Sequence, residues 1–351
     1  MKTEQAVGRE GAAADDPQAI PANRAGQRPI SAPAPDEAGT GTSERRRGSL
    51  SARIILGIAA TTIVLLAAYV GLSMVVADRL TRPERRELAS SPEVFGLTYE
   101  EVVFPSVDDG LLLHGWFLPA AGSDRVVVII HGRNSSRTGN DGDLVAQAAA
   151  LVRAGYNVLA FDFRAHGESA GPRYTMGWHE RSDVLGAVAY LKARGFTPER
   201  MGFWSHSMGA ATMLLTAAAS PDVRAIVADS SFARLDDLLA KELPKNSGLP
   251  GFFNPTILFF GKVLYGMDTA VLNPVDAVSK LPPESLFIIH AKTDQLIPVE
   301  HAHRLATAAG PALYDLWVFP GGSHDRMLFA VPDQYRARVL AFFDRQLRAV
   351  S

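Results

Sequence analysis

Apolar and polar positions divide this chain into three parts. Few large apolar side chains occur in residues 1–50, whereas residues 54–76 form an apolar run without a charge. From about residue 95 to the end, short continuous apolar runs alternate with longer segments of mixed character. Continuous apolar runs separated by helix-like segments are typical of parallel strands that helices cover on both faces. The pattern predicts an α/β fold with a mostly parallel, doubly wound sheet.

Five of the apolar runs are predicted strands that lead into candidate functional residues, and three helices are predicted between them. The strands are Arg125–Ile130, a run beginning at Met201, a run ending near Asp229, Ser285–His290 and Leu313–Phe319. The helices are Asp143–Ala154, Trp178–Arg194 and Gly209–Ala219. One α/β domain accommodates this length without splitting.

The apolar run at residues 54–76 is long enough to span a membrane as a helix. A helix rises about 1.5 Å per residue, and the hydrocarbon core of a bilayer is about 30 Å thick. A buried core helix of this length without a charge is rare. A cleaved signal peptide ending near Ala77 is the other alternative, but such apolar regions span about 7–15 residues and do not follow a long polar tail. We expect a retained transmembrane helix over residues 51–78.

The segments on either side of this helix complete the predicted domain organisation. Residues 1–50 are rich in Ala, Pro and Gly, and they bury too little apolar surface to fold, so a disordered tail is expected. A linker at 79–94 and a folded domain at 95–351 follow. Four arginines lie beside each end of the helix, so the positive-inside rule barely distinguishes the two orientations. We expect the N-in orientation that is common among single-span bacterial proteins, with the domain outside the cytoplasm.

The chemistry-bearing segment is residues 201–209, Met-Gly-Phe-Trp-Ser-His-Ser-Met-Gly, before an Ala-rich helix. A sharp turn from strand to helix around a Ser strains the backbone and presents the hydroxyl at its tip. The pattern is G-x-S-x-G, except that Ser205 replaces the first Gly. Ser207 is therefore the candidate nucleophile. On its own, the pattern is also compatible with a tight turn that has no catalytic role.

A Ser nucleophile requires a base, and the base requires a carboxylate that fixes its tautomer. Asp294 follows the strand Ser285–His290, and His324 follows the strand Leu313–Phe319 within a Gly-rich loop. The order Ser, Asp, His, each beyond a strand, predicts a catalytic triad of Ser207, Asp294 and His324. Asp229 is the alternative position for the acid.

Acyl transfer passes through an oxyanion, which needs preorganised N–H donors. One predicted donor is the backbone N–H of Met208, directly after the nucleophile. The other is the N–H of Arg133, in the loop after His131-Gly132, with Asn134 as the alternative. The alternative interpretation of His131-Gly132 is a plain turn from strand to loop that has no part in an oxyanion hole.

These motifs resemble the α/β-hydrolase superfamily over about three quarters of the chain. The chain is most similar to single-domain serine hydrolases of the serine-aminopeptidase-like and lysophospholipase-like branch. Residues 161–169, Phe-Asp-Phe-Arg-Ala-His-Gly-Glu-Ser, resemble that branch's Asp-x-Arg-Gly-His-Gly-x-Ser turn, with Ala165 in place of a Gly. The resemblance implies an α/β-hydrolase fold, a small helical cap inserted at about 231–283, and a bracing role for Asp162, Arg164 and His166.

Composition narrows the function further. The chain has no Cys, and its His residues show no zinc-binding spacing, so we expect neither a metal nor another cofactor. The net charge of −2 and the dispersed basic residues give no reason to expect nucleic acid. We expect a membrane-anchored serine hydrolase of carboxylic esters, with lipid or acyl-thioester substrates included. The alternatives are a serine peptidase or aminopeptidase, an acyltransferase on the same triad, or a non-catalytic binding module on a membrane anchor.

Overall fold

The computed structural model describes residues 41–324 and 327–347. The first 40 residues of the predicted tail therefore lie outside the described residues. The chain divides into two compact units, residues 1–60 and 61–351. The fold, the site and the contacts described below belong to the second unit.

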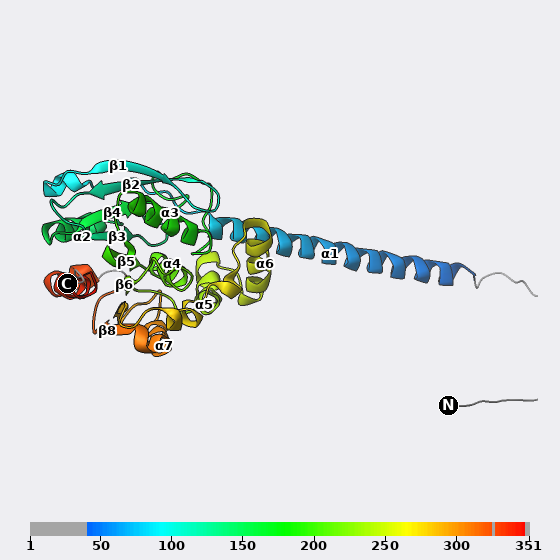
Figure 1. The fold of residues 1–351 in the computed structure, drawn as a ribbon. Coiled ribbons are helices and arrows are strands. Elements are labelled where there is room, and N and C mark those ends of the chain that lie inside the picture. Colours follow the sequence, from blue (N-terminus) through cyan, green and yellow to red (C-terminus); the bar gives the residue numbers. More distant parts are fainter. Residues whose placement is uncertain (1–40, 325–326, 348–351) are drawn as a thin grey trace, which may run out of the picture. The chain divides into compact units, whose positions relative to one another are not determined.

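The core of the second unit is an eight-stranded sheet (Figure 1) with the strand order β1-β2-β4-β3-β5-β6-β7-β8. Strand β2 runs antiparallel to β1 and β4, and the other neighbours are parallel. The topology confirms the predicted α/β-hydrolase fold. The strands are β1 Glu100–Pro105, β2 Leu112–Leu118, β3 Val126–Ile130, β4 Asn157–Phe161, β5 Met201–His206, β6 Ala225–Asp229, β7 Leu286–Ala291 and β8 Leu313–Phe319.

Helices cover both faces of the sheet because the central strands are apolar on both sides. Along β3, Val126, Val128 and Ile130 face one hydrophobic cluster, and Val127 and Ile129 face the other. The first cluster is completed by α3, α4 and α7, and the second by α2 and α9. The covering helices are α2 Asp143–Arg153, α3 Glu180–Ala193, α4 Met208–Ala217, α7 Glu300–Ala309 and α9 Pro332–Gln346, with the short helix α8 Met327–Ala330 before α9.

The predicted elements agree with these bounds within a few residues, and β8 has the predicted bounds. The insertion between β6 and β7 forms a cap, as the resemblance implied. It contains α5 Leu235–Ser247, α6 Asn254–Tyr265 and several short 3₁₀ turns. Figure 1 shows α6 beside the last turns of helix α1, Gly41–Thr81.

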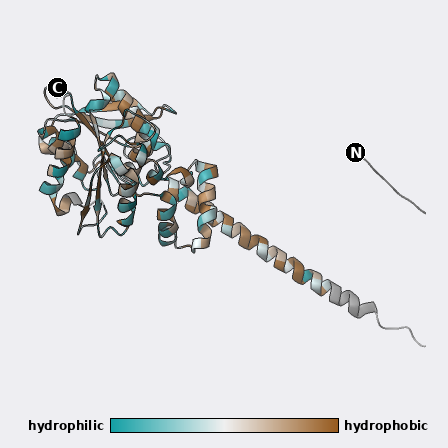
Figure 2. Ribbon diagram, turned by 60° about the horizontal axis from the view of Figure 1, so that its bottom comes forward, coloured by the Kyte–Doolittle hydropathy of each residue, from teal (hydrophilic) through white to brown (hydrophobic). Residues whose placement is uncertain are grey.

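The helix α1, Gly41–Thr81, is longer at both ends than the predicted helix 51–78. Within the described residues it is the one helix long and apolar enough to cross a membrane, as judged by length and composition. Figure 2 shows hydrophobic residues along α1 and on parts of the cap beside its last turns.

The predicted linker 79–94 is not a free connection. Leu80 is buried with the core of the domain, and the Arg85 guanidinium donates hydrogen bonds to the carbonyl oxygens of Gly167, Ser169 and Gly171 at 2.8–2.9 Å. These contacts come from side chains that no local pattern distinguishes from those of an exposed linker, and the domain boundary at residue 95 stays a prediction.

Candidate functional site

Ser207 lies at the sharp turn between β5 and α4. Its backbone has φ 52° and ψ −120°, a left-handed conformation that a non-Gly residue rarely adopts. The turn also requires a close approach at Gly209, where an added Cβ would lie 2.4 Å from the carbonyl oxygen of His131. Ser205, in place of the usual first Gly, fits because its hydroxyl donates a 3.0 Å hydrogen bond to the Val227 carbonyl oxygen. The sequence departure thus leaves the turn intact.

The structure brings together the three residues predicted as a triad. His324 Nδ1 lies 2.7 Å from Asp294 Oδ2, and His324 Nε2 lies 2.8 Å from Ser207 Oγ. An ionised carboxylate only accepts hydrogen bonds, so the Nδ1–H of His324 donates to it. Nε2 is then unprotonated and accepts from the Ser207 hydroxyl. This is the arrangement in which an imidazole can take the proton of a Ser.

Asp294 is held as a carboxylate by its surroundings. Burial alone would raise the pKa of Asp294, but the hydrogen bond and positive charge of His324 lower it, and the net pKa lies below its ordinary value. The backbone N–H groups of Leu296 and Ile297 each donate to its Oδ1 at 2.9 Å. Both carboxylate oxygens are therefore engaged, one by the turn and the other by His324.

The carboxylate of Asp229, the alternative acid, has partners other than His324. Its carboxylate accepts hydrogen bonds from the hydroxyls of Ser230, at 2.8 Å, and Tyr335. Its backbone carbonyl accepts from the Ser207 N–H at 2.8 Å, at the end of β6. Among the described residues, the carboxylate that contacts His324 is Asp294.

The two predicted oxyanion donors flank the same cavity as Ser207. This cavity, of about 70 Å³, is lined by Arg133, Met176, Ser207, Met208, Phe232, Leu238, Leu239, Glu242, Asn246, Leu296 and Ile297. The N–H groups of Arg133 and Met208 donate to no backbone acceptor among the described residues. The N–H of Asn134, the alternative donor, donates to His166 Nε2 at 3.3 Å. The geometry therefore favours Arg133 over Asn134.

Residues 161–169 brace the loop that carries Arg133. The Asp162 carboxylate accepts from the Arg137 N–H at 2.6 Å and from the Arg137 guanidinium, which is fully buried. His166 accepts from Asn134 through Nε2 and lies 2.9 Å from the Arg164 carbonyl oxygen through Nδ1. Burial lowers the pKa of His166 to about 3, so the ring stays neutral and can accept. These contacts fit the bracing role that the resemblance implied.

Several residues of this region carry no signal in the sequence. The hydroxyl of Thr293 donates a hydrogen bond to the Gly322 carbonyl oxygen. This bond connects the loop that carries Asp294 to the loop that carries His324. Tyr335, from α9, donates to the Asp229 carboxylate at the end of β6. Their partners lie 29 and 106 residues away, so only the fold reveals them. Within residues 41–324 and 327–347, no group of His, Asp and Glu side chains has the geometry to hold a metal ion.

Comparisons with known proteins agree with this fold. The family described as "Serine aminopeptidase, S33" matches residues 121–248. The chain is 30% identical to the uncharacterised protein YqkD of Bacillus subtilis over 269 residues, which are 74% of this chain and 85% of YqkD.

Two solved structures bear on the chemistry and on the fold. The esterase Pf2001 of Pyrococcus furiosus is 28% identical, with a TM-score of 0.63, and covers 76% of this chain and 100% of its own. The acylaminoacyl peptidase of Pyrococcus horikoshii is 18% identical, with a TM-score of 0.54, over 73% of this chain and 42% of its own. At that identity, the second likeness concerns the fold alone.

Proposed function

Because the chain belongs to the α/β-hydrolase superfamily, and within it to the serine aminopeptidase S33 family, we propose that it is a membrane-anchored serine hydrolase that cleaves carboxylic esters. Ser207 is the nucleophile, His324 the general base and Asp294 the residue that orients it. The observation that carries this proposal is the pair of hydrogen bonds on His324, 2.7 Å to Asp294 and 2.8 Å to Ser207.

The first step forms a bond between Ser207 Oγ and the carbonyl carbon of the ester. His324 Nε2 accepts the hydroxyl proton as this bond forms, and Asp294 stabilises the resulting imidazolium. The carbonyl oxygen becomes an oxyanion, which accepts hydrogen bonds from the backbone N–H groups of Met208 and Arg133. His324 then gives its proton to the departing alkoxide.

The second step regenerates the enzyme. Water attacks the acyl group on Ser207, and His324 again takes a proton and returns it to the Ser207 oxygen as the acid leaves. A Ser at the elbow, where haloalkane dehalogenases and epoxide hydrolases have an Asp, supports this acyl-enzyme route over theirs. An acyltransferase would use the same first step with an alcohol in place of water.

The cavity supports an ester over a peptide with a free amino terminus. Its lining is mostly apolar, and among the described residues that line it Glu242 is the one with a carboxylate. The Lys245 ammonium lies 2.7 Å from Oε1 of that carboxylate and balances its charge. A protonated substrate amine would therefore compete with Lys245 for Glu242.

The proposal includes the membrane anchor. The apolar residues of α1 before Tyr69 are exposed, and a bilayer would cover them. The N-in orientation would place Ser207 outside the cytoplasm. Digestion of intact cells, or of spheroplasts where an outer membrane is present, with an added protease tests this orientation, and full protection of the C-terminal domain would contradict it.

Hydrolysis of p-nitrophenyl esters from acetate to palmitate by the full chain in detergent tests the activity. The Ser207→Ala variant should lose turnover by about 10⁵-fold or more, the loss typical of a removed nucleophile. Ser205→Ala is the matched control, because it removes a hydroxyl from the same turn and leaves Ser207 in place. Absence of turnover by the unmodified chain on every ester and peptide substrate would favour the binding-module alternative.

A further inference from the structure

One face of the last turns of α1 packs against the cap. Tyr69, Ser73, Ala77 and Leu80 follow one another at helical spacing and are half-buried or buried. The side chains around them stay exposed, as at Leu72 and Val75. A tether that merely linked a membrane helix to the domain would have no such face.

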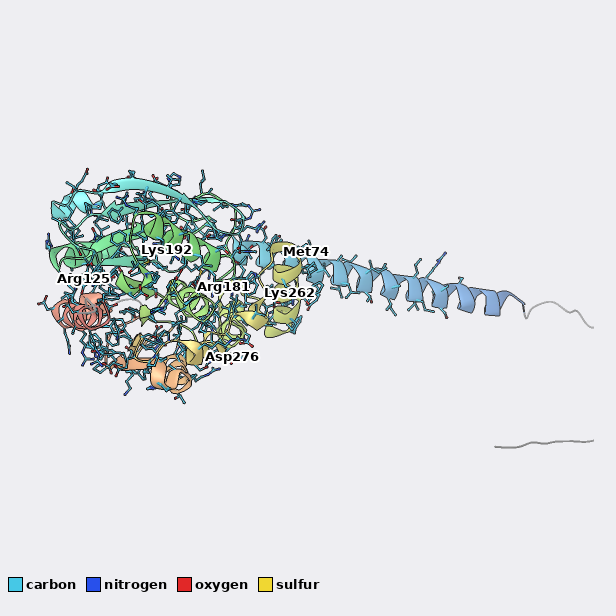
Figure 3. The ribbon with its side chains drawn as sticks, in the orientation of Figure 1. Met74, Arg125, Arg181, Lys192, Lys262 and Asp276 are labelled. Carbon is cyan, nitrogen blue, oxygen red and sulfur yellow. The ribbon has the colours of Figure 1, made fainter. Side chains whose placement is uncertain are left out.

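The cap helix α6 contacts this face at two levels. Near its first turn, the Tyr69 hydroxyl lies 2.6 Å from Thr256 Oγ1 and 3.1 Å from the Phe252 carbonyl oxygen. At its last residue, the Tyr265 hydroxyl donates to Asp78 Oδ1 at 3.2 Å. Figure 3 labels Met74, which lies between Tyr69 and Asp78 along α1, and Lys262, which lies between Thr256 and Tyr265 along α6.

These contacts fix the position of the cap along the axis of α1, relative to the end of the apolar run 54–76. Tyr69 precedes Val76, the last residue of that run, by seven positions, or about 10 Å of helix axis. Asp78, two residues after the run, is the first charged residue and pairs with Arg173. If α1 spans a bilayer, Asp78 lies near its surface, and the cap residues that touch Tyr69 lie at the level of the outer acyl chains.

Apolar side chains of α6 and of the turn before it are exposed. Phe252, in that turn, is 65% exposed, and Phe259 and Val263 of α6 are 57% and 61% exposed. Lys262 is the one charged residue within α6, and its ammonium pairs with Asp268 at 2.7 Å. Such a surface would be unfavourable in water, but it suits the boundary between headgroups and acyl chains.

We propose that α6 lies in the membrane interface beside α1, and that the lipid bilayer is the partner that covers its apolar face. The inference rests on the proposed membrane-spanning role of α1. The apolar face of α6 continues the apolar surface of that helix through the Tyr69 contacts, and the polar group formed by Asp78, Arg173 and Tyr265 marks the aqueous edge.

The same arrangement opens the candidate site toward the bilayer. A second cavity, of about 200 Å³, adjoins the one at Ser207 and is lined by Val76, Arg79 and Leu80 of α1 together with residues of α5. Four residues line both cavities, namely Arg133, Leu239, Glu242 and Asn246. An ester that enters from the bilayer surface beside Val76 would pass these four side chains to reach Ser207, a route that suits an amphiphile with an acyl chain.

Single cysteines carrying an environment-sensitive fluorophore test the membrane contact, since the natural chain contains no Cys. The full chain is reconstituted into vesicles of phosphatidylcholine and phosphatidylglycerol with the substitution Val263→Cys in α6. Leu65→Cys in α1 reports whether that helix spans the bilayer. Val103→Cys on β1 is the matched control, an exposed Val outside the cap.

We expect a lipid-borne nitroxide quencher to reduce the fluorescence at positions 263 and 65 by about twofold or more, and to leave position 103 unchanged. Quenching at 65 without quenching at 263 would overturn the inference. A probe at 263 shielded from both lipid-borne and aqueous quenchers would point to a second copy of the chain, and would overturn it as well. Absence of quenching at 65 would contradict the proposed anchor itself.

Turnover tests the path to the site separately. The double variant Phe259→Asp, Val263→Asp should hydrolyse a long-chain ester embedded in the vesicles about tenfold more slowly, the change expected when an interfacial helix loses its apolar face. Its turnover of soluble p-nitrophenyl acetate should stay within twofold. Equal rates on the embedded ester for the variant and the natural chain would contradict the path. The quenching experiment does not depend on hydrolase activity, so its outcome is distinct from failure of the proposed function.

Discussion

The hydroxyl of Tyr335, in the C-terminal helix α9, donates a hydrogen bond to the carboxylate of Asp229 at the end of β6. This contact occupies the carboxylate that the sequence alone left as the alternative acid. It gives Asp229 a structural role beside the nucleophile turn, and it leaves Asp294 as the partner of His324.

Substitution of the two acids should therefore lower kcat to very different extents. Asp294→Asn should lower kcat by about 10⁴-fold, because an amide no longer fixes the tautomer of His324. Asp229→Asn keeps an acceptor for Tyr335 and should lower kcat only a few-fold. Steady-state kinetics of both variants on one ester check this, and an equal loss of kcat in the two variants would contradict the assignment of Asp294.

Gly209 should tolerate no side chain. An added Cβ would lie 2.4 Å from the His131 carbonyl oxygen, in rigid backbone that cannot move without shifting the nucleophile turn. Gly209→Ala should lower the free energy of unfolding by about 3 kcal/mol or more, as overpacking against a fixed neighbour does. Chemical denaturation measures the change. Gly251→Ala in the cap is the control, because the nearest atom to its added Cβ is 4.0 Å away.

The neutral state of His166 predicts a pH dependence of stability. Burial lowers its pKa to about 3 from an ordinary value of 6.5, so the unfolded chain binds a proton below pH 6.5 that the folded chain does not. The free energy of unfolding should therefore fall as the pH drops, by about 2 kcal/mol between pH 7 and pH 5 for this one group. Thermal unfolding of the natural chain and of His166→Gln measures this difference.

His166→Gln supplies an amide oxygen that can accept from the Asn134 N–H but binds no proton. Its melting temperature should change less between pH 7 and pH 5 than that of the natural chain. His166→Phe, which has no acceptor, should melt lower at both pH values. An identical pH dependence in the natural chain and His166→Gln would show that folding does not lower the pKa of His166, and would contradict the prediction.

Thr293 should matter for rate more than for stability. Its exposed hydroxyl contributes one hydrogen bond, to the Gly322 carbonyl oxygen, and thereby holds the loop of His324 near the acid. Thr293→Val should lower kcat by about tenfold through small displacements of the base, with little change in melting temperature. Thr293→Ser keeps the donor and should restore the rate. A rate unchanged in the Val variant would show that the loop of His324 is held by other contacts.

Local patterns predicted most of the fold, and the reason is visible in β3. Its residues are buried on both faces, so the strand appears in the sequence as a continuous apolar run. Ser207, Asp294 and His324 were predictable because each lies in the turn or loop after an apolar run, namely β5, β7 and β8. The antiparallel strands β1 and β2 were not predicted, since their partly exposed residues give no continuous apolar run.

Two features could not be predicted because they depend on contacts between distant segments: the choice between the two acids and the packing of α1 on the cap. The Asp229 carboxylate accepts from Tyr335, 106 residues away, and His324 contacts Asp294, 30 residues away. The packing of Tyr69 on the cap joins residues 183 positions apart, and an apolar transmembrane pattern looks the same with or without it. Such contacts follow from the three-dimensional arrangement, so no local pattern reports them.

The most direct test of the central claim is covalent labelling of the full chain by a fluorophosphonate, followed by mass spectrometric mapping of the adduct. Only a Ser activated by a neighbouring base reacts readily with such a reagent. We predict one adduct on Ser207 and none in Ser207→Ala. An adduct on another residue, or no adduct on the folded natural chain, would contradict the assignment of Ser207 as the nucleophile.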